Sequence, residues 1–126
     1  GTQRACADLS FVANPATGVY VYYSGSWYGV GGTSVSAPCI SGFLALCNQL
    51  RVANSKAKLS TIASSSVCFQ TFCYQTISKN PTTYAANFYD ITSGVVGNQT
   101  AGSGYDLPTG LGSPIGNQLA TTISNL

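Results

Sequence analysis

The sequence predicts an α/β fold, because a strand-forming segment is followed by a long apolar stretch with helical periodicity. Residues 18–24 read GVYVYYS and are rich in Val and Tyr, which favour strands. Gly25-Ser26 is a turn signal, and residues 27–30 continue as a second short strand or a return of the first. Apolar residues after Thr33 recur at spacings of three and four, the period of a helix. They comprise Val35, Cys39, Phe43, Leu46 and Leu50.

The helix expected at about residues 33–54 also carries many small residues. These are Ser36, Ala37, Ser41, Gly42 and Ala45. An apolar helix lined with small residues packs closely on several sides, so we expect it to lie in the middle of a larger protein. The chain is therefore expected to be poorly folded and inactive on its own.

The remaining segments have weaker signals. A second short helix is expected at residues 56–64, and residues 67–89 are expected to be mostly loop. Ser113 and Pro114 are typical of an N-cap and the first position of a helix. The C-terminal helix that they introduce has one apolar stripe. It is made of Ile115, Leu119 and Ile123.

The composition excludes several classes of protein. A length of 126 residues suits one domain or part of one. The net charge of +2 comes from scattered side chains, whereas nucleic-acid binding needs a clustered basic face. No run approaches the roughly 18 apolar residues of a membrane span. Only 6% of the residues are charged, so the net charge of the surface hardly changes with pH. This suits a protein in an acidic or extracellular setting, but a secreted domain that merely has few charges would have the same composition. Because the chain opens with Gly1 and contains no Met, it is expected to be a processed product.

The five cysteines are Cys6, Cys39, Cys47, Cys68 and Cys73. Their spacing does not match a zinc site, and no His is present, so disulfides formed in an oxidising compartment are expected. Cys68 and Cys73 flank a short stretch and are the expected pair. Cys39 and Cys47 share the long helix, where eight residues span about 12 Å, which is too far for a disulfide. The odd count leaves one thiol free or bonded to another chain.

The most informative stretch is GTSVSAP at residues 32–38. A glycine turn delivers Ser34 to the start of a buried helix, where the helix dipole and free N–H groups favour developing negative charge. The N–H of Ser34 can itself contribute to an oxyanion hole. Pro38 agrees with a helix that starts at about Thr33 or Ser34, because proline is tolerated near the first turn. An isolated Gly-Thr-Ser is more often an N-cap after a turn, so the longer motif makes Ser34 a candidate nucleophile.

The full motif, GGTSVSAP at residues 31–38, resembles the nucleophile motif shared by subtilisins and sedolisins. In both families a Ser follows Gly-Thr, and a Pro lies four residues further on. Residues 8–22 are similar to the sedolisin stretch usually written PDVSAxADPxTGxxVY, with Ala7 in place of the Pro and Asn14 in place of the second Asp. The resemblance covers nearly the whole chain and is weakest at about residues 56–86. The chain is therefore similar to the C-terminal part of the catalytic domain of a sedolisin, a serine-carboxyl peptidase.

The resemblance implies a subtilisin-like parallel sheet flanked by helices, of which residues 1–126 are the C-terminal part, as a light chain or fragment. It also implies an acid-acting endopeptidase or tripeptidyl-peptidase, in which Ser34 attacks the scissile carbonyl of a peptide or protein substrate. In this family a Glu is the base, one Asp orients it and another Asp supplies the oxyanion hole, all upstream of the matched region. This chain has no Glu, and Asp8 matches a position that the family uses structurally. The site is thus expected to be complete only with an upstream heavy chain of the same precursor.

The second informative stretch lies in residues 88–114, where two Asp residues bracket a Gly-rich loop. Carboxylate and carbonyl oxygens suit Ca²⁺, although two Asp residues that cap turns give the same pattern. The stretch resembles the sedolisin segment DITxGxN…AGxGYDxxTGLGSP, which folds into a calcium loop. Carried over residue by residue, this resemblance implies one structural Ca²⁺. Its ligands are the side chains of Asp90 and Asp106 and the carbonyls of Ile91, Gly102 and Gly104.

Two other hypotheses stay open on the sequence. A subtilisin relative with an upstream His base would work best at neutral or alkaline pH. A catalytically inactive, calcium-stabilised homologue would act as a binding module. Residues 98–100, Asn-Gln-Thr, form an N-glycosylation sequon, which agrees with a secreted protein or one of a lysosome or acidic vacuole. The tyrosines at 20–23 can line substrate, but a half-buried sheet face is the commoner use of such a strand.

Overall fold

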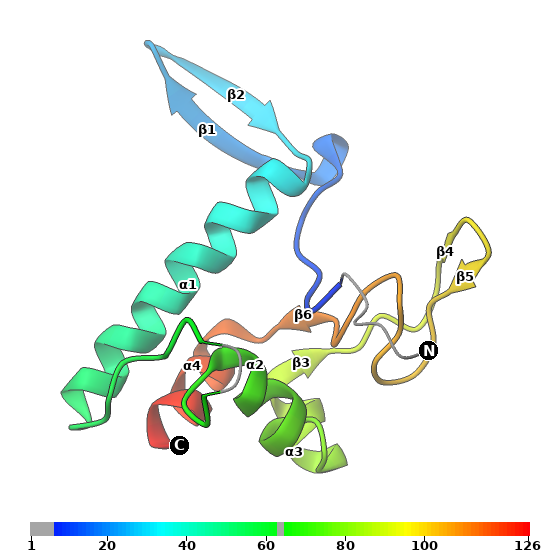
Figure 1. The fold of residues 1–126 in the computed structure, drawn as a ribbon. Helices are drawn as coiled ribbons and strands as arrows, with labels where there is room; N and C mark the ends of the chain where they lie inside the picture. The colour runs from blue at the N-terminus through cyan, green and yellow to red at the C-terminus, as the bar shows by residue number, and fades with distance from the viewer. Residues whose placement is uncertain (1–6, 63–64) are drawn as a thin grey trace.

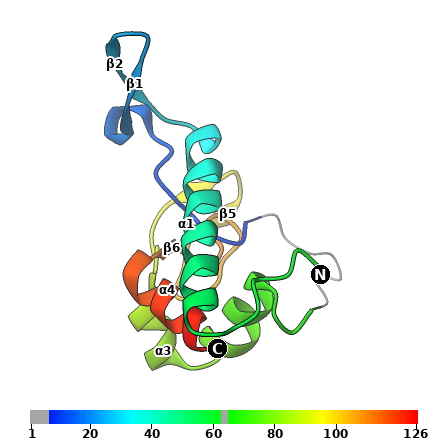
Figure 2. The same cartoon turned by 90° about the vertical axis from the view of Figure 1, so that its left-hand side faces the viewer.

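The computed structural model describes residues 7–62 and 65–126, whose arrangement is shown in Figure 1 and, turned by 90°, in Figure 2. Short 3-10 and π-helical segments carry the label η. The elements in chain order are η1 (Pro15–Thr17), β1 (Val19–Tyr23), β2 (Ser26–Val30), α1 (Thr33–Ala53), α2 (Phe69–Thr71), η2 (Phe72–Ile77), α3 (Pro81–Asn87), β3 (Phe88–Tyr89), β4 (Val95–Val96), β5 (Gln99–Thr100), β6 (Ser113–Pro114) and α4 (Gly116–Asn125). None of the helices in these residues is long and apolar enough to cross a membrane.

The β1–β2 hairpin confirms the predicted strands. The two strands are antiparallel, with Tyr22 opposite Trp27. The turn uses Ser24 and Gly25 with φ angles of 48° and 84°, the left-handed pair that matches the twist of a two-residue hairpin. The hairpin projects from one end of the molecule in Figure 1, and its tyrosines are exposed. The half-buried sheet face expected there is therefore not formed by the described residues.

Helix α1 begins and ends within a residue of its predicted bounds. Pro38 lies in its second turn rather than its first, and the helix continues past it. Because proline has no N–H, the carbonyl of Ser34 lacks its usual partner four residues along the helix. Leu46, Leu50 and Val52 are exposed on α1, so the described residues leave much of its apolar surface uncovered.

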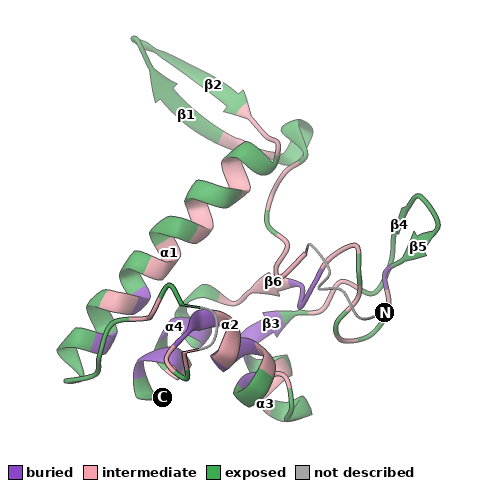
Figure 3. Ribbon diagram, viewed as in Figure 1, coloured by how far each residue is buried: buried purple, intermediate pink, exposed green. Residues whose placement is uncertain are grey.

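The core lies at the end of the molecule away from the hairpin, where α4, α2, η2 and β3 gather around the C-terminal half of α1 (Figure 3). It is built mainly from apolar side chains that are fully or nearly fully buried. These are Cys47, Phe69, Phe72, Cys73, Ile77, Phe88, Leu111, Leu119, Ala120 and Ile123. The apolar stripe predicted for the C-terminal helix thus faces the core through Leu119 and Ile123.

Arg51 is 2% exposed and joins three segments of this core. Its Nε donates to the Ala57 carbonyl over 2.7 Å, and its Nη1 donates to the Ile123 carbonyl over 2.6 Å. The guanidinium also lies over the Phe72 ring, with its central carbon 5.1 Å from the ring centroid. A buried charge needs such partners, and the negative ends of the α1 and α4 dipoles add to them.

Two predictions between α1 and β3 are wrong. No helix forms in residues 56–62, and residues 63–64, which complete the predicted helix, lie outside the described residues. Leu59 instead donates its N–H to Asn48 Oδ1 over 2.7 Å, and Ser60 pairs with the chain at Cys68 as an isolated bridge. Side-chain contact with α1 therefore overrides the helical propensity of this segment.

Residues 67–89 are mostly helical rather than loop, because they contain α2, η2 and α3. Helix α3 has a clear start signal: Asn80 accepts the N–H groups of Thr82 and Thr83, and Pro81 occupies the first helical position. The sequence predicts the same kind of helix start at Ser113 and Pro114, and there the prediction is wrong. These two residues form strand β6, and α4 begins only at Gly116.

The expected disulfide between Cys68 and Cys73 is also wrong, because both thiols are free. The chain between them is helical, so five residues at 1.5 Å each separate the two Cα atoms by about 7.5 Å along the axis, which is beyond the range for a disulfide. The Cys68 thiol donates to Gln70 Oε1 over 2.9 Å. Cys39 and Cys47 are free as well, as the helix geometry predicts, whereas Cys6 lies outside the described residues.

The three sheets of the described residues are two-stranded and antiparallel: β1 with β2, β3 with β6, and β4 with β5. The parallel sheet expected from the family resemblance is not among them. These short strands hold the loops that carry the candidate site residues.

Candidate functional site

Ser34 lies at the exposed N-terminal end of α1, where the hairpin returns to the body of the molecule (Figure 1). Gly32 is the N-cap with φ of 94°, and its carbonyl accepts the N–H groups of Val35 and Ser36 at 2.9 and 3.3 Å. The N–H of Ser34 is one of the first in the helix and so has no partner within it. Hydroxyl and N–H thus stand together at the positive end of the helix dipole, an arrangement suited to a nucleophile whose attack creates an oxyanion.

The segment just before η1 holds this turn in place. The Gly32 N–H donates to the Ala13 carbonyl, and the Ser36 hydroxyl donates to the Val12 carbonyl over 2.8 Å. Gly31 packs so closely that a Cβ there would lie 2.5 Å from the nitrogen of Pro15. Gly32 therefore supplies a left-handed backbone angle at the cap, and Gly31 allows the close approach of the segment at Ala13 and Pro15.

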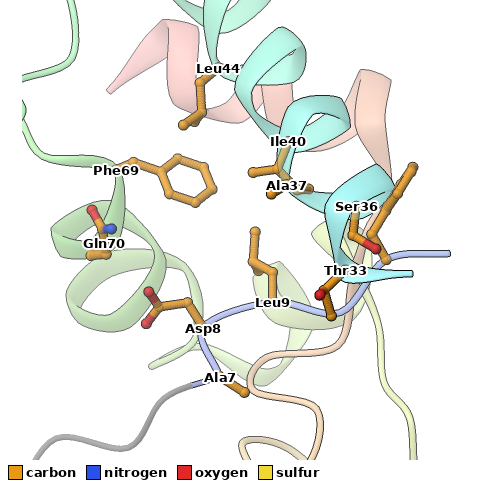
Figure 4. Close-up of a pocket in the computed structure, with 11 residues that line it drawn as sticks. Ala7, Asp8, Leu9, Thr33, Ser36, Ala37, Ile40, Leu44, Phe69 and Gln70 are labelled. Carbon is orange, nitrogen blue, oxygen red and sulfur yellow. The ribbon is translucent and has the colours of Figure 1, made fainter. Parts of the chain in front are cut away.

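An apolar hollow of about 370 Å³ opens beside the first turns of α1 (Figure 4). Thr33, Ser36, Ala37 and Ile40 line one side, and Asp8, Phe69 and Gln70 line the other. Ser34 is not among its lining residues, so the hollow lies beside the turn that carries Ser34 rather than under the Ser34 hydroxyl. The Asp8 carboxylate accepts the Tyr74 hydroxyl over 2.7 Å.

Asp8 also acts through its backbone. Its carbonyl accepts the Leu111 N–H over 2.9 Å, and a Cβ on Gly110 would lie 2.4 Å from that same carbonyl oxygen. Nearby, Ser10 donates its N–H to Gly112 over 3.0 Å. The residues that lead toward the turn with Ser34 therefore pack directly on the end of the Gly-rich loop, which explains why that loop needs glycines at its exit.

The Gly-rich loop brings the two predicted carboxylate ligands to one turn. Asp106 Oδ2 accepts the Gly102 N–H over 2.9 Å, and Asp90 Oδ2 accepts the Gly104 N–H over 2.8 Å. Asp106 Oδ1 accepts both the N–H and the hydroxyl of Thr109 at 2.8 Å. Within the described part of the chain, the carbonyl oxygens of the other three predicted ligands accept no hydrogen bond. Those carbonyls belong to Ile91, Gly102 and Gly104.

The electrostatics of the loop follow from these contacts. The hydrogen bond from the Gly102 N–H, with those from Thr109, holds the pKa of Asp106 below its ordinary value. Burial, followed by the contact with Asp90, raises the pKa of Tyr84 well above its ordinary value. The Tyr84 hydroxyl reaches Asp90 Oδ1 at 2.9 Å and the Leu111 carbonyl at 3.1 Å. It therefore stays protonated as a donor between the two ends of the loop.

Three side chains of this region were missed at the level of sequence. Thr109 lies three residues after Asp106, a spacing at which an Asp commonly caps a turn, so that contact had a local signal. Tyr74 and Tyr84 had none, because their partners are brought close only by the fold. The described residues contain no cluster of three or more His, Cys, Asp or Glu side chains that could hold a metal. A cation site in the loop would thus consist of two carboxylates and carbonyl oxygens.

Two curated proteins and a solved structure are similar to this chain. No family model matches the chain. Sedolisin of Pseudomonas sp. (strain 101) is 34% identical over 115 residues, covering 88% of this chain, and kumamolisin of Bacillus sp. (strain MN-32) is 34% identical over 128 aligned positions, covering 94%. The chain spans only 17% and 19% of the length of these two relatives.

A solved structure gives the same result in three dimensions. It is that of a Pseudomonas sedolisin, a serine-carboxyl proteinase complexed with two molecules of pseudo-iodotyrostatin. The match has a TM-score of 0.69 at 31% identity and covers 94% of this chain and 29% of the solved chain. Sequence and fold thus agree over almost the whole of this chain, which belongs to the sedolisin family.

Proposed function

We propose that this chain is the C-terminal, nucleophile-bearing part of an acid-acting serine-carboxyl peptidase, and that Ser34 is the nucleophile. The observation that carries the proposal is the position of Ser34: it is exposed in the first turn of α1, with its own N–H free of the helix. A serine that only caps a helix would bind the N–H groups of that turn, but here Gly32 occupies the cap.

In the proposed reaction, the Ser34 oxygen attacks the scissile carbonyl carbon of a peptide and a Glu–Asp pair takes its proton. The N–H of Ser34 then donates to the oxyanion, together with a further Asp. The pair then returns this proton to the peptide nitrogen as the C–N bond breaks, so the amine leaves and an acyl group remains on Ser34. Water next attacks the acyl carbon, which releases the carboxylic acid and restores the Ser34 hydroxyl. This chain contains neither Glu nor His, so the base must come from elsewhere. We assign the Glu–Asp pair and the oxyanion Asp to an upstream heavy chain of the same precursor.

The same upstream part would supply the parallel sheet. This is supported by the small share of the relatives that the chain spans and by the apolar surface that the described residues leave uncovered on α1. The hollow beside Thr33 and Ile40 has a mainly apolar lining, which suits burial against further elements of the protein rather than exposure to water.

We further propose that the Gly-rich loop holds one Ca²⁺. The donor set fits a hard cation, because Asp90 and Asp106 supply two carboxylates and the three carbonyls of the loop accept no hydrogen bond from the described residues. Asp90, Ile91, Gly102, Gly104 and Asp106 would hold the ion. Its role would be structural: it neutralises two carboxylates on one short turn and fixes a loop that is costly to order. We propose that the protein is secreted or lies in a lysosome or acidic vacuole, because these locations suit a calcium site and an acid-acting peptidase.

The function is tested with the complete protein, including any heavy chain, by replacing Ser34 with Ala and measuring peptide hydrolysis. The matched control is Ser41→Ala, because Ser41 is exposed on the same helix and its hydroxyl only donates back to the Ala37 carbonyl. We expect a loss on the order of a millionfold in kcat for Ser34→Ala and full activity for the control. More than a hundredth of the parent activity in Ser34→Ala would rule out Ser34 as the nucleophile.

Two further outcomes separate the alternatives. A parent protein that neither hydrolyses peptides nor reacts with a peptide aldehyde would be an inactive, calcium-stabilised binding module. A rate that rises steadily from about pH 5 to 8 would indicate a His base, as in subtilisins, since the unperturbed pKa of His is about 6.5. The proposed Glu base requires activity that is highest in acid and lost toward neutral pH.

A further inference from the structure

The β4–β5 hairpin is an exposed feature that the proposed reaction does not use. It projects from the Gly-rich loop, on the opposite side of the molecule from α1 (Figure 1). Val95 pairs with Thr100, and the hairpin is closed by the Ala101 N–H, which donates to the Gly94 carbonyl over 2.9 Å. The turn between the strands has two residues, and its first, Gly97, has φ of 61°, as the tightest hairpin turns require.

Asn98 is the second residue of this turn, so the geometry of the hairpin presents its side chain at the tip. The whole of residues 92–100 is exposed. Asn98 Oδ1 accepts a hydrogen bond from Gln99 Nε2 over 3.2 Å. Its own amide nitrogen has no hydrogen-bond partner in the described part of the chain. Thr100, which completes the Asn-Gln-Thr triplet, is exposed on β5.

The sequence contains a second Asn-x-Thr triplet with the opposite properties. In Asn80-Pro81-Thr82 the middle residue is proline, which excludes glycosylation of the asparagine. Asn80 is also committed structurally, because its Oδ1 accepts the N–H groups of Thr82 and Thr83 at the start of α3. One asparagine is therefore a structural cap, whereas the other is an exposed amide on a turn.

The surroundings of Asn98 favour a covering group. Val95 and Val96 are 66% and 67% exposed on β4, and residues 91–105 carry no charged side chain. Exposed strand edges are protected from pairing with another chain by shortness, by charged side chains or by proline. This hairpin has short strands but neither charges nor proline, so a covering group would add to the protection of its apolar edge.

We propose that Asn98 is an N-glycosylation site and that its glycan covers the exposed edge of the β4–β5 hairpin. The donor class is a lipid-linked oligosaccharide diphosphate. The Asn98 amide nitrogen attacks the anomeric carbon of the first sugar and forms the C–N bond. The bond from that carbon to the diphosphate oxygen breaks, the lipid diphosphate leaves with the electron pair, and the amide loses one proton. Because Asn98 lies at an exposed tip, the finished glycan points into solvent and does not hinder folding.

The test uses the complete precursor secreted from a eukaryotic host. Glycans are released by peptide N-glycosidase in ¹⁸O-water, which converts a modified Asn into ¹⁸O-labelled Asp, and the peptides are read by mass spectrometry. We expect label at position 98 and none at position 80. Asn98→Gln and Thr100→Val should lose the label, whereas Thr100→Ser should keep it. Secreted protein whose position 98 carries no label would overturn the site, and so would a glycan that persists in Asn98→Gln on the peptide that contains residue 98.

The covering role has its own readout. Enzymatically deglycosylated protein should be cleaved faster at residues 95–101 by an added protease than the glycosylated form, and should self-associate more. Equal cleavage and equal association of the two forms would overturn that role. The proposal depends on passage through a secretory compartment, which belongs to the proposed function, but not on catalysis. The peptidase activity of the Asn98→Gln protein is therefore measured as well. It tests the proposed function in the absence of the glycan, so that failure of one proposal is distinguished from failure of the other.

Discussion

The Ser36 hydroxyl donates a hydrogen bond to the Val12 carbonyl over 2.8 Å and so ties the first turn of α1 to the segment before η1. Replacing Ser36 with Ala leaves that partly buried carbonyl without a partner, which costs about 1–3 kcal/mol. We expect a lower Tm for Ser36→Ala and a fall in kcat with little change in KM, because Ser34 sits in the same turn. Ser41→Ala, on the exposed part of the helix, should change neither, and a Ser36→Ala protein with parental kcat and Tm would contradict this role.

Gly31 and Gly42 make a matched pair for the space around α1. A Cβ on Gly31 would lie 2.5 Å from the Pro15 nitrogen, whereas one on Gly42 meets nothing within 4 Å. Gly31→Ala should therefore displace the nucleophile turn and abolish most activity. Gly42→Ala should instead raise the unfolding free energy by roughly 0.5–1 kcal/mol, because alanine favours a helix interior. Thermal melting and peptide hydrolysis of both variants check this, and equal effects of the two would be inconsistent with the packing described.

Tyr84 tests whether the Gly-rich loop holds calcium. Tyr84→Phe removes the hydroxyl that reaches Asp90 and the Leu111 carbonyl, so Asp90 loses a partner that orients it. We expect calcium affinity to fall by about tenfold, as is usual when a residue supporting a metal ligand is lost. Tyr89→Phe is the control, because Tyr89 is 65% exposed. Calorimetric titration of calcium-depleted protein measures both, and a parent protein that binds no calcium would make the loop a metal-free turn.

Acid should loosen the same loop even when a chelator is present. Hydrogen bonds from Gly102 and Thr109 lower the pKa of Asp106 in the folded state. A lowered pKa stabilises the fold above the unfolded pKa of about 3.9, and this contribution is lost as pH falls through the folded pKa. The Tm of the parent should therefore fall more steeply below about pH 4 than that of Asp106→Asn. Parallel Tm curves for the two proteins would show that these contacts do not stabilise the charged form.

The buried thiols should resist alkylation in the native protein. Burial raises the pKa of Cys47 to about 11 and that of Cys73 well beyond its ordinary value, so almost no reactive thiolate is present at pH 8. Iodoacetamide should leave both unmodified until denaturant is added, as peptide mapping would reveal. Cys39, which is only partly buried, serves as the comparison. Complete labelling of Cys47 or Cys73 without denaturant would contradict the core as described.

How far the sequence predicts this structure depends on how local the determining contacts are. The hairpin, α1 and the buried stripe of α4 follow from turn residues and periodicity that are read within a few positions. The helices of residues 67–89 were missed although Asn80 and Pro81 mark the start of one, because the apolar spacing there is irregular. Ser113 and Pro114 carry the same kind of signal but pair with β3 instead, a contact between residues far apart in the chain.

The candidate site divides in the same way. Ser34 and the five loop residues are predicted from short motifs and stay predictions, and the fold places Asp90 and Asp106 against the same turn. The supporting contacts of Tyr74 and Tyr84 were not found, since each joins segments that only the folded chain brings together. The disulfide prediction is wrong although Cys68 and Cys73 are close in sequence. The helical backbone between them does not bring their sulfur atoms close enough to bond, and both thiols are free.

Arg51 gives the junction of α1, α4 and residues 56–59 a property that the carboxylate contacts elsewhere lack. Its hydrogen-bond partners are the main-chain carbonyls of Ala57 and Ile123, which bind no proton across the pH range in which carboxylates titrate. The bond pattern is therefore the same at pH 3 as at pH 7. For the acid-acting function proposed above, a core fastened by a cation and neutral acceptors is an advantage, because no proton can disconnect these acceptors.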